Sequence, residues 1–138
     1  MTTPMPSTTP SEQNVPHPAD RSPLDSSTQY RPACVTAQTT VGSRDEAETL
    51  ASSAVDQGLA ACVQVSAVRS FYRWEGKVHS DPEFLLTFKT TAEAAAGPLR
   101  AHIDTTHAYD EPEYIVQPIT DGSESYLAWI QESMQPAE

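Results

Sequence analysis

The order of strand-like and helix-like segments in the sequence predicts an α+β fold for residues 34–138. Three observations lead to it. A strand-like segment precedes a run of helical spacing, two long strand-like segments flank Glu75-Gly76, and a second helical run precedes a last strand. With a final helix, the order is β-α-β-β-α-β-α. This is the ferredoxin-like, split βαβ arrangement with an extra C-terminal helix, in which helices cover one face of an antiparallel sheet.

The first 33 residues differ in composition from the rest of the chain. They hold seven of its 12 prolines and are otherwise rich in Ser and Thr. Such a segment has too few apolar side chains to offset the entropy lost on ordering, so we predict a disordered tail over residues 1–33. A single domain then covers residues 34–138.

The first strand and the first helix follow from short local patterns. Residues 34–41, CVTAQTTV, are rich in β-branched side chains, which favour a strand. Ser43 and Glu46 have the spacing of a capping box, and apolar residues then recur at helical intervals. Gly58 stands where a left-handed residue would end this helix.

A long central hairpin is predicted over residues 59–90. Residues 59–74 alternate imperfectly, which indicates a bend or bulge near Ser66, and Glu75-Gly76 supplies a tight turn. Pro82 should lie at a bulge or at an unpaired position of the returning strand. Three side chains of that strand share one face: Phe84, Leu86 and Phe88.

The last third of the domain predicts a helix, a strand and a helix. Thr90 and Glu93 have capping-box spacing, and residues 92–105 follow as a helix that Gly97-Pro98 delays or kinks. Pro118 makes residues 113–119 an edge or bulged strand. We expect these side chains to face inward from the two helices: Ala96, Leu99, Ile103, Tyr126, Leu127, Ile130 and Met134.

The charge of the chain excludes several classes of partner. Its net charge is −11, of which −1 belongs to residues 1–33 and −10 to the domain. An acidic surface repels nucleic acid and anionic membranes and leaves room for cations. No apolar run is long enough to span a membrane and no signal peptide is evident, so we expect a cytoplasmic protein. Two cysteines are too few for a disulfide framework, which favours reduced thiols.

The segment THAYDEPEY, residues 106–114, is the first candidate metal site. A neutral imidazole with hard carboxylates suits Zn, Cu(II) or Mn. The spacing matches no closed metal motif, and alternation would place Asp110 on the other side from Glu111 and Glu113. The segment is therefore interpreted as a structural or subunit-contact loop. Any metal site there needs ligands from elsewhere, with His107 and Asp110 as its best contributors.

The cysteines, the basic residues and the catalytic motifs each leave an interpretation open. Cys62 is expected to be a small core residue, with copper ligation as the alternative, and Cys34 is expected at the exposed domain edge. The arm cations Arg69, Arg73 and Lys77 favour ion pairs or cation–π contacts at an interface, with a small anion at an intersubunit cleft as the alternative. No GxSxG elbow occurs and the histidines are scattered, so no enzyme is expected.

Five motifs, in order and at matching spacing, resemble the divalent-cation tolerance proteins of the CutA family: AACV at 60–63, VRSFYRWEGKV at 68–78, FLLTFKT at 84–90, HAYDEPEYI at 107–115 and SYLAWI at 125–130. The resemblance covers roughly residues 35–134. It implies a ferredoxin-like subunit in a tight homotrimer whose hairpin arms pair with neighbouring subunits. It also implies tolerance of copper and other divalent cations, no established reaction, and a likeness in fold and assembly to PII signalling proteins.

The hairpin supports the oligomer independently of the resemblance, because one small domain can hardly bury its aromatic side chains. We assign the subunit interface to four residues: Phe71, Tyr72, Trp74 and Tyr109. The candidate metal ligands are His107, Asp110 and Cys62, for a copper or other divalent ion that the fold does not require. The protein partner is not identified by the sequence.

The sequence departs from the family pattern in two places. The usual HPYE-type motif has Ala108 in place of Pro and Asp110 in place of Glu, which restores backbone freedom and shortens the reach of the carboxylate. A cysteine seen in some members just before the first helix has no match here, because Val41 or its neighbours occupy that place and Cys34 comes several residues earlier. Copper binding by that thiol therefore does not carry over.

Overall fold

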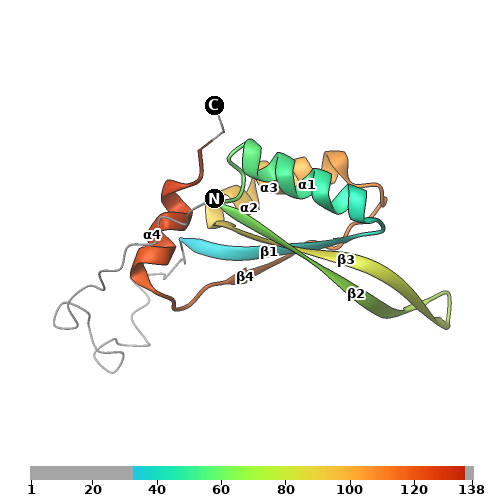
Figure 1. Ribbon diagram of the computed structural model, residues 1–138. Helices are drawn as coiled ribbons and strands as arrows, with labels where there is room; N and C mark the ends of the chain where they lie inside the picture. The colour runs from blue at the N-terminus through green and yellow to red at the C-terminus, as the bar shows by residue number, and fades with distance from the viewer. Residues whose placement is uncertain (1–32, 136–138) are drawn as a thin grey trace, which may run out of the picture.

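The computed structural model describes residues 33–135 and shows four strands and four helices within them (Figure 1). The strands are β1 Cys34–Val41, β2 Cys62–Trp74, β3 Lys77–Thr91 and β4 Ile115–Pro118. The helices are α1 Arg44–Asp56, α2 Ala92–Ala96, α3 Pro98–Thr106 and α4 Glu124–Glu132. The tail predicted as disordered, residues 1–33, lies outside the described residues apart from Ala33, and so do residues 136–138.

The strands form one sheet in the order β2-β3-β1-β4, and each neighbouring pair is antiparallel. The helices α1, α2 and α3 cover one face of this sheet, as predicted, whereas α4 lies at the end of the sheet where β1 begins (Figure 1). The α+β class predicted from the order of segments is confirmed.

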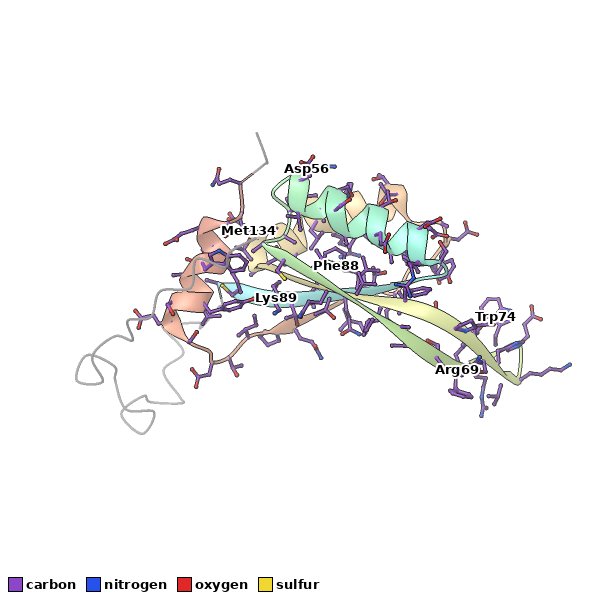
Figure 2. All side chains as sticks on the ribbon, viewed as in Figure 1. Asp56, Arg69, Trp74, Phe88, Lys89 and Met134 are labelled. Atoms are coloured by element: carbon purple, nitrogen blue, oxygen red, sulfur yellow. The ribbon has the colours of Figure 1, made fainter. Side chains whose placement is uncertain are left out.

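The main core lies between the sheet and the two longer covering helices. Phe88 of β3 is fully buried there, beneath the helices (Figure 2). Phe84 is partly buried against the same cluster, so the predicted inward face of β3 is confirmed. The cluster also includes these buried residues: Ala37, Val41, Leu50, Ala54, Leu86, Leu99 and Ile103. Burying a side chain of this size contributes about 1.5–3 kcal/mol to the hydrophobic free energy.

The predicted start and end of α1 are confirmed. The Ser43 hydroxyl accepts a hydrogen bond from the backbone N–H of Glu46 at 3.1 Å, which satisfies one of the free donors of the first turn. After the helix, Gly58 has φ of 73°, the left-handed conformation that glycine adopts at little cost.

The structure corrects the expected irregularities of the hairpin. Pairing between β2 and β3 runs without interruption from Cys62 opposite Lys89 to Trp74 opposite Lys77, so the bulge expected near Ser66 is absent. Pro82 lies opposite Arg69 in the same regular ladder. It is accommodated because β1 ends opposite Phe84, which leaves β3 with one open edge at Pro82.

The helix predicted over residues 92–105 is two helices. The cap is Thr91, whose hydroxyl accepts from the Ala94 N–H at 3.2 Å. Thr90 is instead buried in the ladder with β1, and its hydroxyl donates to the Leu59 carbonyl at 2.8 Å. Gly97 separates α2 from α3, and Pro98 takes the first position of α3, where its missing N–H costs nothing. The break shifts the inward face, so Ala94 and Ala95 are buried and Ala96 is exposed.

Beyond the last pair with β1, the hairpin continues alone as an arm, which we define as residues 68–83. Its turn has Glu75 at φ 50° and Gly76 at φ 76°. Two successive positive φ values match the twist of the flanking strands, as in a type I′ hairpin turn. The arm extends well past β1 and the helices (Figure 1), so the helices cannot cover its side chains.

Candidate functional site

A groove of about 1060 Å³ lies between the arm and the loop that joins α3 to β4. Five carboxylates line it: Asp81, Glu83, Asp110, Glu111 and Glu113. Four aromatic side chains also line it: Phe71, Tyr72, Trp74 and Tyr109. We call it the acidic groove. It combines an apolar surface with an unusual density of negative charge.

The four aromatic residues assigned to a subunit interface all border this groove. Phe71 and Trp74 are the most open of them, with exposed fractions of 70% and 61%. Large apolar side chains left this open in one chain are typical of a surface that contacts another molecule.

Two of the aromatic residues hold two of the carboxylates in place. Tyr72 donates a hydrogen bond to Asp81 across the arm, and Tyr109 donates to Glu83 at 3.2 Å from the loop. The hydrogen bond to Asp81 is the main cause that raises the pKa of Tyr72, with burial and the charges of Asp81 and Glu83 adding to it. Burial, then Glu83, raises the pKa of Tyr109. Both phenols therefore stay neutral at neutral pH and act as hydrogen-bond donors to the carboxylates.

The remaining carboxylates of the groove also lack a positive partner. Glu113 accepts from the side-chain amide of Gln38 at 3.1 Å, and Asp110 and Glu111 are exposed. Within residues 33–135 the single ion pair joins Arg100 to Asp104 on α3, outside the groove. The groove thus holds five carboxylates that no cation of residues 33–135 neutralises.

His107 fixes the position of the loop. Its Nε2 lies 2.7 Å from the Thr40 carbonyl oxygen of β1, and its Nδ1 accepts the backbone N–H of Tyr109 at 3.0 Å. This pattern requires the neutral ring with its proton on Nε2. Both ring nitrogens are therefore engaged, and a metal ion could reach His107 only after the Tyr109 N–H released Nδ1.

The loop brings its carboxylates together rather than separating them. Asp110 borders the same groove as Glu111 and Glu113, so the expectation that alternation would place it on the other side is wrong. The reason is that residues 107–114 lie before β4 begins and do not form an extended strand.

Two groove carboxylates and one glycine were missed by the sequence analysis. Asp81 and Glu83 come from the returning strand of the arm. Pairing residues outward from the Glu75-Gly76 turn would have placed Tyr72 opposite His79, and so Asp81 at the diagonal position next to Tyr72 on the same face. A Cβ on Gly42 would lie 3.1 Å from the Tyr109 hydroxyl, so this position favours a residue without a side chain. No local pattern signals that contact.

The two cysteines lie apart from the groove. Cys62 is half-buried. It lies four residues along β2 from Ser66, and Ser66 and Thr40 lie on either side of the same residue of β3. Cys62 is therefore roughly 13 Å along the sheet from the end of β1 at Thr40. Cys34 was expected at an exposed edge, but α4 covers it and it is 4% exposed. Burial raises the pKa of the Cys34 thiol, and Gln131 partly opposes this shift.

Within the described residues, no three His, Cys, Asp or Glu side chains converge in a way that would hold a metal ion. The structure therefore places Asp110 beside four other carboxylates, but it does not bring His107, Asp110 and Cys62 to one point. Residues 33–135 also contain no helix with the length and apolar character that crossing a membrane requires.

The chain folds into a small α+β domain with a two-stranded arm that extends from one end of an antiparallel sheet. The acidic groove lies between this arm and the loop that joins α3 to β4. Residues 35–133 match the family described as CutA1 divalent ion tolerance protein. The chain belongs to this family, and the resemblance noted from the five motifs is confirmed.

Named relatives agree with this assignment. The chain is 47% identical over 95 residues to a protein of Arabidopsis thaliana named Protein CutA, chloroplastic, which covers 68% of this chain and 52% of the relative. It is 41% identical over 95 residues to the divalent-cation tolerance protein CutA of Thermus thermophilus, which covers 68% and 91%. The chain therefore spans about half the length of the plant relative and nearly all of the bacterial one.

A solved structure supports the fold. The CutA structure of Synechococcus elongatus superposes with a TM-score of 0.72 at 34% identity, and the match covers 76% of this chain and 93% of that chain. The family and these relatives are named for tolerance of divalent cations, or simply as CutA, and not for a reaction.

Proposed function

We propose that this chain is a divalent-cation tolerance protein that assembles as a homotrimer of ferredoxin-like subunits and binds Cu(II) or other divalent cations weakly in the acidic groove. The observation that carries the proposal is the set of five groove carboxylates without a positive partner among the residues that the structure describes. A negative groove attracts cations and raises their local concentration.

The ligand chemistry favours a weak site. Asp110 and Glu111 are exposed carboxylates with freely accessible oxygens, which are hard ligands that most divalent ions accept. His107 would add a nitrogen ligand only by giving up the Tyr109 N–H. That exchange costs one hydrogen bond, about 0.5–1.5 kcal/mol net. Among divalent first-row ions, Cu(II) gains most from such mixed oxygen and nitrogen ligands.

Cys62 could bind a metal ion only at a site separate from the acidic groove. It lies along the sheet from the groove, so it cannot complete a site with Asp110 in one subunit. As a half-buried thiol on the edge strand β2, it would offer copper a single soft ligand.

The proposed trimer is supported by two features. The sheet order β2-β3-β1-β4 is the order of a split βαβ sheet, and it leaves both β2 and β4 with an unpaired edge. The arm carries open aromatic side chains that its own chain does not cover, among them Phe71 and Trp74. A neighbouring subunit could cover both features at once.

Calorimetric titration tests the metal site. We expect Cu(II) to release or absorb heat with the wild-type protein and to bind less tightly to Asp110→Ala with Glu111→Ala, since two of the five carboxylates are lost. His107→Ala tests the candidate imidazole ligand separately. Glu48→Ala with Asp56→Ala, on the exposed face of α1, is the matched control and should bind like the wild type. Equal binding by all variants would place the cation elsewhere.

The alternative is a PII-like signalling or scaffold trimer that recognises a small anion or a partner protein at an intersubunit cleft. No Lys or Arg lines the groove, so an anion would find no countercharge there within one chain. Thermal-shift measurements with a nucleotide and metabolite panel separate the two functions. Stabilisation by an anion without any effect of metal would favour the alternative.

We also propose a cytoplasmic location, supported by the two free cysteines. Cell fractionation of the full chain tests it. Recovery in a periplasmic or organelle fraction would contradict it.

A further inference from the structure

The arm has two chemically different faces. Because pairing is continuous, directly opposite residues share a face: Arg69 with Pro82 and Arg73 with Val78 on one, Tyr72 with His79 on the other. The side-chain contacts agree, since Arg69 donates to the Ser80 hydroxyl at 2.7 Å on the first face and Tyr72 donates to Asp81 on the second. Figure 2 shows Arg69 and Trp74 on the arm, away from the helices, and Trp74 lies next to the turn.

The first face is basic and apolar, and we call it the basic face. Arg69 and Arg73 project from it with Val78, which is 72% exposed. With Lys77, which lies opposite Trp74 on the second face, the arm carries three of the eight Lys and Arg residues of an otherwise acidic chain. None of the three forms an ion pair within residues 33–135.

The second face forms most of the arm's side of the acidic groove. Asp81 and the aromatic rings of Tyr72 and Trp74 belong to it, while Phe71 and Pro82 of the first face also border the groove, and the loop carboxylates Asp110 and Glu111 form the opposite wall. Within residues 33–135 neither Arg69 nor Arg73 forms an ion pair with these carboxylates. Their charges are therefore free to be matched between copies.

We propose that the basic face of one copy's arm docks in the acidic groove of the next copy, where Arg69 and Arg73 pair with groove carboxylates. The inference rests on the proposed homotrimer and adds which surfaces meet and why. The two surfaces are different, so the contact is head-to-tail, and head-to-tail contacts close into a ring when the rotation permits. Each groove is then completed by a neighbouring chain.

The energetics favour a charged partner over a neutral one. Packing the open aromatic rings of the groove against another chain would also remove its carboxylates from water, and carboxylates buried without a partner cost several kcal/mol each. Guanidinium groups offset this cost because they bind carboxylates through two parallel hydrogen bonds. Two arginines against five carboxylates leave a charge of −3 in the groove, so a divalent cation could still enter it.

Charge reversal with rescue tests this contact. Arg69→Glu with Arg73→Glu reverses the basic face, and Asp110→Lys with Glu111→Lys reverses the loop wall of the groove. Asp110 and Glu111 make no side-chain hydrogen bond within residues 33–135, so their replacement disturbs no described contact. The combined variant restores opposite charges with the signs exchanged. Glu48→Lys with Asp56→Lys, on the exposed face of α1, applies the same change in net charge as the groove reversal, but away from the arm.

The measurement is subunit exchange between two mass-labelled forms of the full chain, followed by native mass spectrometry in EDTA so that metal binding plays no part. Each reversed variant should exchange about tenfold faster than wild type or more, because lost charge pairs act mainly on dissociation. The combined variant should return toward the wild-type rate, and the α1 control should match the wild type.

The outcomes separate this inference from the proposed function. Wild-type protein that sediments as a monomer would refute the proposed trimer itself. A stable trimer whose reversed variants exchange like the α1 control would leave the trimer standing and refute the arm-to-groove pairing. Faster exchange in both reversed variants without recovery in the combined one would also refute it, since the charges would then act separately.

Discussion

In the body of the domain, Leu86 and Phe88 of β3 are fully buried beneath α1 and α3, whereas in the arm Val78 of the same strand is 72% exposed. One strand therefore serves two environments. The change falls at Phe84, the first residue of β3 that pairs with β1. Before Phe84 the strand has only β2 as its neighbour, and from Phe84 on it lies between β2 and β1.

The difference in burial shows that one chain can cover the side chains of the body but not those of the arm. An isolated two-stranded hairpin is marginally stable in water, because it has no third layer to bury its side chains. The arm compensates with local contacts, such as the Tyr72–His79 stack at 5.6 Å and the Tyr72–Asp81 hydrogen bond. These contacts hold its shape but leave its apolar surface open, which supports the proposed contact with another chain.

The sharpest test of this comparison removes the same side chain from each region. Phe88→Ala should lower the free energy of unfolding by about 3–5 kcal/mol, because it leaves a cavity in the main core. Phe71→Ala in the arm should change it by about 0.5 kcal/mol or less. Both are made in the Trp74→Asp background, which we expect to be monomeric, and compared by urea denaturation. Equal losses would show that the arm is packed against the body.

A second test addresses the arm alone. Trp74→Asp should shift the sedimentation coefficient of the protein toward that of the monomer, because a charge replaces an aromatic contact worth about 2–4 kcal/mol. The far-ultraviolet circular dichroism of the body should stay unchanged. Trp74→Phe keeps an apolar ring and should remain assembled. A trimer that persists in Trp74→Asp would exclude Trp74 from the interface.

The same division explains which parts of the fold the sequence predicts. The cap of α1 and the Glu75-Gly76 turn depend on side chains and backbone preferences within a few residues, and both are found where predicted. Thr90 and Thr91 are neighbours with the same capping chemistry, and only the burial of Thr90 decides between them. The bulge expected near Ser66 is absent because β2 and β3 keep their regular pairing even where the alternation of apolar and polar residues is imperfect.

The site was harder to predict because its parts come from distant segments. Tyr109 and Asp110 could be picked out from their loop, but Asp81 and Glu83 join them only through the hairpin. The engagement of His107 depends on a backbone carbonyl of β1, which no side-chain pattern reveals. The burial of Cys34 likewise depends on α4, which begins some 90 residues later in the chain and whose Leu127 carbonyl accepts from the thiol at 3.5 Å.

The smallest expected effect concerns two tyrosines whose pKa values are raised for different reasons. Burial is the main cause that raises the pKa of Tyr114 in the body to about 12, and its hydroxyl donates to the Ala95 carbonyl at 2.6 Å. Because the folded state favours the neutral phenol, this stabilisation is complete below the ordinary pKa of about 10 and is lost as pH rises through about 12. In the arm, the hydrogen bond to Asp81 leads the shift of Tyr72.

Asp81→Asn should therefore lower the pKa of Tyr72 toward its ordinary value and leave the Tyr114 transition in place. Near-ultraviolet difference absorbance during an alkaline titration measures both, with Tyr72→Phe and Tyr114→Phe to assign the transitions. If Asp81→Asn moved the Tyr114 transition as well, the arm and the body would be electrostatically coupled. If it moved neither, the carboxylates of the groove would already be neutralised in the assembled protein by a cation or by the basic face of a neighbouring copy.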